Sequence, residues 1–262
     1  MVMRILYGVA LSGNMNQFEH IVAWLPHIGL YLPNVDNRPE FDTLRRDSLT
    51  LADEQVDRLY SFLPNKITSD YSRFMVDLER YLDNSKEPMA TRGMGYLYNR
   101  LIDGTLFDRV VFGDDKYFTL YYKHKHAQLK QAIEHIGNGA ILLDLHSFNP
   151  VPLACDMDKR PNRPDICLGF NEDETKPDES ILQELQEHFE DNGLKVAFNT
   201  PFSGAMTTNT QTKYKSLMIE VNKKCYLENH VPTKNMYRLS YVLKEAILLL
   251  RPQPKKRAFE WM

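Results

Sequence analysis

Three short apolar segments in this sequence are each followed by side chains that can take part in chemistry. The segments are residues 21–25, 140–143 and 217–219, and the motifs after them are Pro26-His27-Ile28-Gly29, Asp144-Leu145-His146-Ser147 and Glu220-Val221-Asn222. Apolar runs without polar alternation are typical of strands buried on both faces of a parallel sheet. Because open α/β sheets bind ligands at the carboxyl ends of their strands, we expect these motifs to line one cleft.

Strand-like and helix-like patterns alternate along the chain. Strands are expected at residues 21–25, 73–78, 140–145, 165–168, 195–198 and 217–221, and helices at 52–63, 116–136, 178–192 and 233–250. Residues 30–50 and 84–114 contain helix-breaking residues and charges and are expected to be irregular. The pattern predicts an α/β fold with a mainly parallel or mixed sheet flanked by helices, in a single domain of residues 1–262.

The composition is that of an ordinary globular protein, with 43% hydrophobic residues and a net charge of −3 over 262 residues. Basic residues gather at 121–126 and 255–257, but both clusters are too short to indicate a nucleic-acid surface. The apolar run at residues 5–11 falls short of the ~20 residues that span a bilayer. We therefore expect neither a nucleic-acid nor a membrane partner.

The three cysteines, Cys155, Cys167 and Cys225, are widely spaced and include no Cys-x-x-Cys pair. This spacing favours neither a disulfide framework nor a thiolate zinc site. Free thiols are typical of reducing compartments, so we expect a cytoplasmic protein.

His27 and His146 are the first candidates for metal ligands. A single histidine after a strand is usually a packed or surface residue, but two at strand ends, with an acid nearby, match the ligand set of a catalytic zinc. A further carboxylate would act on the water that the metal activates. Asp144 and His146 lie two residues apart on a strand, so they share a face, and Asp144 can orient His146 or contact a substrate.

The order of the motifs resembles the N-formylglutamate amidohydrolase family, which is related in fold to zinc carboxypeptidases and aspartoacylases. The segments that carry the resemblance are PHIG (26–29), ADEQVDRLY (52–60), SRFMVDLER (72–80), DLHS (144–147), PDICLG (164–169) and IEVNK (219–223). An ordered series over roughly residues 20 to 230 is more specific than any one motif. Ile28, Gln55 and Glu79 depart from the family pattern, in which a small residue, a His and an Asn stand at these positions.

The resemblance implies one zinc ion bound by His27, Asp53 and His146, with Glu220 as the general acid and base. It also implies that planar guanidinium groups bind the carboxylates of the substrate, and the candidates are Arg73 and Arg80. The other residues expected to contact the substrate are Asp144, Ser203, Gly204 and Asn222.

Most of these roles have a structural alternative that the sequence leaves open. The alternatives are a helix cap for Asp53, ion pairs of Arg73 or Arg80 with Asp70, Asp77 or Asp83, a plain turn at Ser203-Gly204, and an ion pair of Glu220 with Lys223 or Lys224.

Together, the residues and the resemblance predict a zinc-dependent hydrolase of N-acyl amino acids. The leading substrate is N-formyl-L-glutamate, an activity that the resemblance connects with histidine degradation. The alternatives are a deacylase or carboxypeptidase-like hydrolase of another acyl-amino acid or small peptide, and a non-catalytic binding protein on the same fold. The expected partner is a small-molecule substrate, and the oligomeric state stays open.

Overall fold

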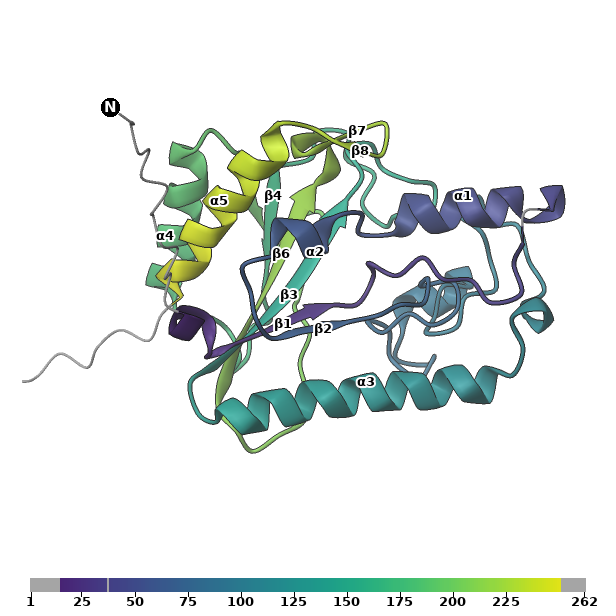
Figure 1. The fold of residues 1–262 in the computed structure, drawn as a ribbon, viewed down its shortest axis with the longest axis horizontal. Helices are drawn as coiled ribbons and strands as arrows, with labels where there is room; N and C mark the ends of the chain where they lie inside the picture. Colours follow the sequence, from purple (N-terminus) through teal and green to yellow (C-terminus); the bar gives the residue numbers. More distant parts are fainter. Residues whose placement is uncertain (1–14, 37, 251–262) are drawn as a thin grey trace, which may run out of the picture.

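A six-stranded sheet forms the centre of the molecule in the computed structural model, which describes residues 15–36 and 38–250 (Figure 1). In order across the sheet, the strands are β2 (Lys66–Thr68), β1 (Ile21–Leu25), β3 (Ala140–Phe148), β6 (Tyr214–Asn222), β4 (Ile166–Gly169) and β5 (Val196–Phe198). Neighbouring strands are parallel except for β6 and β4, which are antiparallel. This arrangement confirms the predicted α/β fold with a mixed sheet. A hairpin of β7 (Leu227–Glu228) and β8 (Val231–Pro232) forms a separate small sheet.

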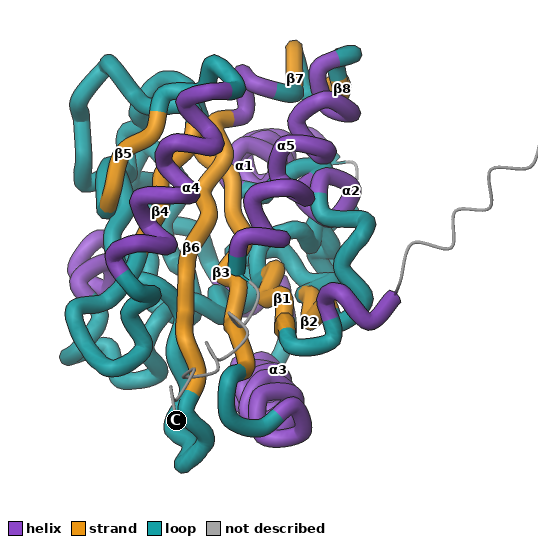
Figure 2. Tube along the Cα trace, turned by 90° about the vertical axis from the view of Figure 1, so that its left-hand side faces the viewer, coloured by secondary structure: helices purple, strands orange, loops and turns teal. Residues whose placement is uncertain are grey.

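Helices flank both faces of the sheet (Figures 1 and 2). The α-helices of the described residues are α1 (Asp42–Leu51), α2 (Val56–Leu59), α3 (Asp115–Ile136), α4 (Glu179–Asp191) and α5 (Asn235–Leu249). Short 3-10 helices are η1 (Met15–Phe18), η2 (Pro39–Phe41), η3 (Pro88–Arg92), η4 (Arg109–Phe112) and η5 (Lys223–Cys225). Helices α2, α4 and α5 pack against one face of the sheet, and α3 packs against the other.

The central strands are buried on both faces, which explains their apolar sequences. In β3, Ile141 and Leu143 belong to the core beneath α2, α4 and α5, whereas Leu142 belongs to the core beneath α3. Successive residues of a strand point to opposite faces. Asp144 and His146 therefore lie on the α3 face of the sheet, near the carboxyl end of β3.

Helix α3 follows its sequence signals closely, because the helix predicted at residues 116–136 spans Asp115–Ile136. The Asp114 side chain accepts a hydrogen bond from the Lys116 backbone N–H and caps the first turn. Gly137, with φ of 84°, ends the helix in a conformation that favours glycine. Other predictions also agree with the structure to within a few residues, namely the strands at 21–25, 140–145, 165–168, 195–198 and 217–221 and the helices at 178–192 and 233–250.

The predictions for residues 30–63 are partly wrong. Helix α1 (Asp42–Leu51) occupies the second half of residues 30–50, which we expected to be irregular, and extends one residue further. The helix expected at 52–63 is reduced to the four residues of α2. Helix α1 ends because Ala52 adopts an extended backbone, and Gln55 then takes a left-handed φ of 63°. Asp53 therefore lies in the junction between two helices and not in the first turn of one.

The strand expected at residues 73–78 is also wrong, because these residues form turns. Their backbone is buried, yet it needs no strand partner. Arg109 donates hydrogen bonds to the carbonyl oxygens of Phe74 and Met75, and the Asp77 N–H donates to the carbonyl oxygen of Tyr96. Groups distant in the sequence thus replace the hydrogen bonds of a sheet.

Two sequence features lie outside the described residues, namely the apolar run at 5–11 and the basic residues at 255–257. Within residues 15–36 and 38–250, no helix is both long and apolar enough to cross a membrane.

Candidate metal centre and active site

A cavity of about 580 Å³ lies on the α3 side of the sheet, where β1, β3 and β6 end. It is lined by every predicted site residue except Asn222, namely His27, Asp53, Arg73, Arg80, Asp144, His146, Ser203, Gly204 and Glu220. The three strand-end motifs of the sequence thus meet in one cleft.

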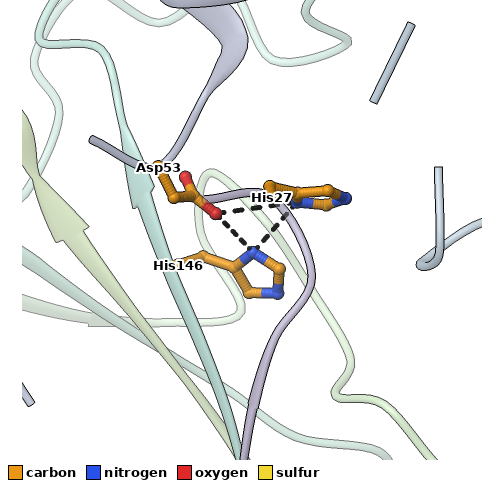
Figure 3. A group of neighbouring side chains, drawn as sticks. All are labelled: His27, Asp53 and His146. Atoms are coloured by element: carbon orange, nitrogen blue, oxygen red, sulfur yellow. Dashed lines mark hydrogen bonds and ion pairs between the residues drawn. The ribbon is translucent and has the colours of Figure 1, made fainter. Parts of the chain in front are cut away.

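Three of these side chains converge closely, as Figure 3 shows. His27 Nδ1 lies 3.2 Å from His146 Nδ1, and Asp53 Oδ2 lies 3.0 Å from His146 Nδ1 and 3.6 Å from His27 Nδ1. All three side chains are buried. They form a compact group of two ring nitrogens and one carboxylate oxygen, which could hold a metal ion.

The opposite ring nitrogen of each histidine contacts a carboxylate. His27 Nε2 lies 2.8 Å from Asp77 Oδ1, and His146 Nε2 lies 2.6 Å from Asp144 Oδ1. Because an ionised carboxylate can only accept, each Nε2 carries the proton, and in a neutral ring each Nδ1 then presents a lone pair. Carboxylate partners of this kind are usual for histidines that bind metals.

This donor set fits a zinc ion. When both rings are neutral, two lone pairs and a carboxylate oxygen face one another, and a cation between them would satisfy all three. A tetrahedral zinc with ligand bonds of about 2.0–2.1 Å holds its ligand atoms about 3.3 Å apart. The separations of 3.0 to 3.6 Å between the three atoms agree with that geometry.

Asp53 is held in place from two sides. Its backbone N–H donates to the carbonyl oxygen of His27 at 2.9 Å, and its Oδ1 accepts from the Ser147 N–H at 2.9 Å and the Ser147 hydroxyl at 3.0 Å. These contacts leave Oδ2 directed at the histidines. Burial would raise the pKa of Asp53, but the neighbouring imidazoles of His146 and His27 lower it below its ordinary value. The carboxylate is therefore ionised.

Asp77 is the residue at this site that sequence reasoning did not assign. Besides His27, its carboxylate accepts hydrogen bonds from Arg73 Nη2 at 2.8 Å, Arg73 Nε at 3.1 Å and the Tyr98 hydroxyl at 2.6 Å. Burial would raise the pKa of Asp77, but Arg73 and His27 hold it well below its ordinary value. Asp77 thus links the histidine to the arginines that line the cavity. Asp77 was expected from the sequence only as a possible ion-pair partner of Arg73 or Arg80, and its contact with His27 was not foreseen.

Glu220 pairs with His146 in the register of β3 and β6, so the two residues lie side by side on the sheet. Among the described residues, Glu220 Oε2 is buried without a hydrogen-bond partner. Burial is the largest cause of its altered acidity and raises the pKa of Glu220 to about 8. The proposed ion pairs with Lys223 and Lys224 do not form, because Lys223 lies 3.6 Å from Glu54 and Lys224 lies 2.9 Å from Asp165.

The two candidate arginines differ in how fully they are engaged. Arg73 donates twice to Asp77 and also donates to the carbonyl oxygen of Leu51. The ion-pair alternative with Asp77 is present for both arginines, more loosely for Arg80. Arg80 Nε lies 3.6 Å from Asp77 Oδ2 and has no hydrogen-bond partner among the described residues. Both side chains line the cavity. Arg80 is therefore the freer of the two to bind an anion.

Comparison with known proteins gives the same family as the motifs. A sequence model of the N-formylglutamate amidohydrolase family matches residues 20–227. The chain belongs to this family. No similar sequence was found among proteins with curated functions.

Two solved structures share the fold of this N-formylglutamate amidohydrolase family member. The crystal structure of N-formylglutamate amidohydrolase from Ralstonia eutropha JMP134 superposes with a TM-score of 0.68 at 20% identity, covering 88% of this chain and 91% of that one. The crystal structure of gene product Atu2144 from Agrobacterium tumefaciens superposes with a TM-score of 0.57 at 14% identity, covering 87% and 90%.

Of the three departures from the family pattern, only Glu79 lines the cavity. Ile28 packs against the core beneath α2, α4 and α5. Gln55 accepts a hydrogen bond from Arg58 and does not line the cavity. Two of the three departures are thus removed from the place where a substrate would bind.

Glu79 lies close to the second histidine of the candidate metal site. It accepts a hydrogen bond from the Trp24 indole N–H, and its Oε1 lies 3.9 Å from His146 Nε2. Burial and the nearby Asp144 hold the pKa of Glu79 well above its ordinary value. Glu79, Asp144 and His146 form a second close group. His146 uses this Nε2 to donate to Asp144, so the nitrogen is not offered as a ligand.

Three other residues predicted to contact the substrate form hydrogen bonds within the protein, namely Asp144, Gly204 and Asn222. Asp144 Oδ2 accepts from the Met206 N–H at 2.8 Å, so this carboxylate ties the loop after β5 to His146. The Gly204 N–H donates to the Asn199 side chain, although Ser203 and Gly204 do line the cavity. In contrast to the prediction, Asn222 does not line the cavity. Its side-chain amide donates to the Pro164 carbonyl oxygen and accepts from the Lys224 N–H.

Proposed function

We propose that this chain is a zinc-dependent hydrolase that cleaves the amide bond of an N-acyl amino acid, with N-formyl-L-glutamate as the leading substrate. One observation carries the proposal. Two histidine nitrogens and an Asp53 oxygen converge, and the neighbour of His146 on the next strand is Glu220, whose buried Oε2 has no hydrogen-bond partner among the described residues. Membership of an amidohydrolase family supports the same reaction.

In the proposed reaction, zinc bound by His27, Asp53 and His146 would polarise the scissile carbonyl and lower the pKa of a water molecule. Glu220 accepts the proton from the attacking water and donates it to the nitrogen of the leaving amine. Asp77 and Asp144 keep each imidazole in the orientation and tautomer that binds metal.

Arg73 and Arg80 would bind the amino acid part of the substrate. A planar guanidinium group binds a carboxylate through two parallel hydrogen bonds. Arg80 is the better placed of the two, because its Nε has no hydrogen-bond partner among the described residues, and Arg73 lies beside it on the same carboxylate of Asp77. A substrate carboxylate at Arg80 would bring the amide toward His146 and Glu220, which line the same cavity.

The proposal includes a cytoplasmic location, an activity in histidine degradation and a single catalytic domain. The three cysteines are free thiols, which supports a reducing compartment.

The test is a screen of N-acyl amino acids with the zinc-loaded full chain, in which release of the free amino acid is measured. We expect N-formyl-L-glutamate or a close analogue to be hydrolysed, with free amino acid and acid formed in equal amounts. Hydrolysis of other acyl-amino acids or small peptides alone would favour the deacylase alternative. Binding without turnover for every compound would favour a non-catalytic protein and overturn the proposal.

A further inference from the structure

We infer that the acyl side of the cavity accepts an uncharged, apolar acyl group larger than formyl, against a wall formed by Phe148, Phe202, Ala205, Met206 and Met218. The inference rests on the proposed function and names its substrate class more narrowly. All five residues line the cavity that holds the candidate metal group.

The wall lies directly beside the groups that would carry out the chemistry. Phe148 is two residues after His146 on β3, and Met218 is two residues before Glu220 on β6. Because alternate residues of a strand share a face, these four side chains lie on the same side of the sheet. An acyl group attached to a carbonyl near His146 and Glu220 would therefore meet apolar surface on both neighbouring strands.

Residues of the loop after β5 complete the wall. Phe148 and Met218 are buried in a small apolar cluster with Cys167, and Phe202 and Ala205 pack against it. The rings of Phe148 and Phe202 lie 5.8 Å apart at 61°, an edge-to-face contact. Four of the five wall residues thus form one packed surface, and the fifth, Met206, packs against the core beneath α3.

The size of the cavity exceeds what the leading substrate needs. A volume of about 580 Å³ lies in the range of roughly 300–1,000 Å³ found for pockets that enclose drug-sized ligands. A formyl group has a single carbon and no apolar chain, so it would leave the wall uncovered. Covering apolar surface is favourable in proportion to the area removed from water.

The positions of the charged residues in the cavity indicate how the two ends of the substrate would be oriented. Arg73 and Arg80 surround Asp77, which contacts His27 after β1, on one side of the central strand β3. The wall lies toward β6 and β4, on the other side of β3. An amino acid carboxylate at the arginines and an acyl chain at the wall would place the amide between them, near His146.

A rival arrangement is an acyl chain that ends in a carboxylate bound by Arg163. The guanidinium carbon of Arg163 lies 5.8 Å from the Phe148 ring and 5.7 Å from the Phe202 ring, and its Nε lacks a partner among the described residues. However, Arg163 already donates to Asp156 at 2.6 Å and to the carbonyl oxygens of Asn149 and Asp158. Because Asp156 balances its charge, we favour an uncharged acyl group.

The test measures kcat/KM of the zinc-loaded full chain for five acyl groups on L-glutamate, namely formyl, acetyl, butyryl, hexanoyl and succinyl. The same five acyl groups are then compared on L-alanine. The comparison starts at acetyl, because the formyl carbonyl is intrinsically more reactive than those of the longer acyl groups. From acetyl to hexanoyl, kcat/KM should rise about two- to fourfold for each methylene group that contacts the wall. Butyryl should also be preferred to succinyl.

A variant of Phe202 tests whether the wall causes the expected preference for longer acyl groups. Phe202→Ala should lower the ratio of kcat/KM for hexanoyl over acetyl by about tenfold. Phe198→Ala is the matched control, because this phenylalanine packs against Phe170 and does not line the cavity. It should leave the ratio unchanged.

The outcomes separate the inference from the proposed function. A flat or falling series from acetyl to hexanoyl, with N-formyl-L-glutamate hydrolysed well, overturns the inference and leaves the proposed function intact. A preference for succinyl over butyryl also overturns it, in favour of Arg163. An equal change of the ratio in Phe202→Ala and Phe198→Ala removes the wall as its cause. No hydrolysis of any compound overturns the proposed function and this inference with it.

Discussion

At the scale of single residues, Glu220 is distinguished by its burial and by an oxygen that has no partner among the described residues. Glu220→Gln keeps the size of the side chain but removes its ability to accept a proton. If Glu220 is the acid and base, this change should lower kcat by about 10²–10⁴ while zinc content and melting temperature stay the same. Loss of zinc would make Glu220 a metal ligand, and nearly normal turnover would make it structural.

The free donors of Arg80 lead to a second prediction at this scale. Arg80→Lys replaces a planar fork with a point charge, so KM for a carboxylate substrate should rise about tenfold with kcat nearly unchanged. Arg100→Lys is the control, because Arg100 donates to the Gly104 carbonyl oxygen and does not line the cavity. Steady-state kinetics of both variants, measured on the best substrate of the screen, decide the matter. Equal KM values in the two variants would remove Arg80 from the site.

At the scale of elements, the irregular segment of residues 69–81 matters as much as the strands. It carries Asp77, which joins His27, Arg73 and Tyr98 through hydrogen bonds. Removing such a carboxylate partner from a metal-binding histidine typically weakens metal binding about 10–100-fold. The segment therefore sets the geometry of the candidate metal group, although it contributes none of the three candidate ligands.

Asp77→Asn should accordingly reduce zinc affinity by about 10–100-fold, since an amide supports the imidazole less strongly than a carboxylate. The measurement is competition with a chromogenic zinc chelator. Asp36→Asn is the control, because Asp36 forms an exposed ion pair with Arg38. If zinc affinity in Asp77→Asn equals that in the control, Asp77 does not support the metal group.

The elements also explain which parts of the fold the sequence could reveal. The runs that became β1, β3 and β6 are apolar on both faces, and helix α3 carries its own cap and stop signal at Asp114 and Gly137. These are local signals. Asp144 beside His146 was likewise predicted, because residues two apart on a strand share a face.

The remainder depended on partners that are distant in the sequence. The alternation of Phe74, Val76 and Leu78 indicated a strand, but the backbone there is satisfied by Arg109 and Tyr96 and forms turns. The three-residue strand β2 was missed because it has no apolar run. Asp53 was assigned to a helical turn, whereas a hydrogen bond to the His27 carbonyl oxygen holds it in a junction.

At the scale of the whole molecule, the fold brings together groups that no local segment contains. His27 and His146 are 119 residues apart in sequence and 3.2 Å apart in space. They meet because β1 and β3 are adjacent parallel strands at the centre of the sheet. The candidate metal group therefore exists only in the folded chain, so zinc binding and folding should stabilise each other.

The buried acids and histidines also predict how the stability of the metal-free protein depends on pH. Burial raises the pKa of Glu220 to about 8, so from about pH 4.5 to 8 the folded chain holds a proton that the unfolded chain has lost. For His146, burial lowers the pKa, but Asp144 and Asp53 outweigh it and hold the pKa well above 6.5. Glu79, whose pKa is also raised, acts in the same direction as these two groups. All three make folded stability fall as pH rises, the acids from about pH 4.5 and His146 from about pH 6.5. The unfolding free energy in urea should be lower at pH 9 than at pH 6 by about 3 kcal/mol or more, since Glu220 alone accounts for about two pH units at ~1.4 kcal/mol each.

Chelator-treated Glu220→Gln provides the comparison for that experiment. It lacks one of the titrating groups, so its stability should fall less between pH 6 and pH 9. A metal-free wild-type chain whose stability rises over this range would show that the charges of the site are assigned wrongly.

The most direct test of the central claim is a zinc titration of the chelator-treated chain, with hydrolysis measured on the best N-acyl amino acid of the screen. We predict that chelation abolishes turnover and that activity returns to a plateau at about one zinc per chain. The same titration of His146→Ala should restore nothing, because that variant lacks one of the three converging ligand atoms. Full turnover by the metal-free wild-type chain, or zinc-restored turnover in His146→Ala, would contradict a zinc-dependent hydrolase built on His27, Asp53 and His146.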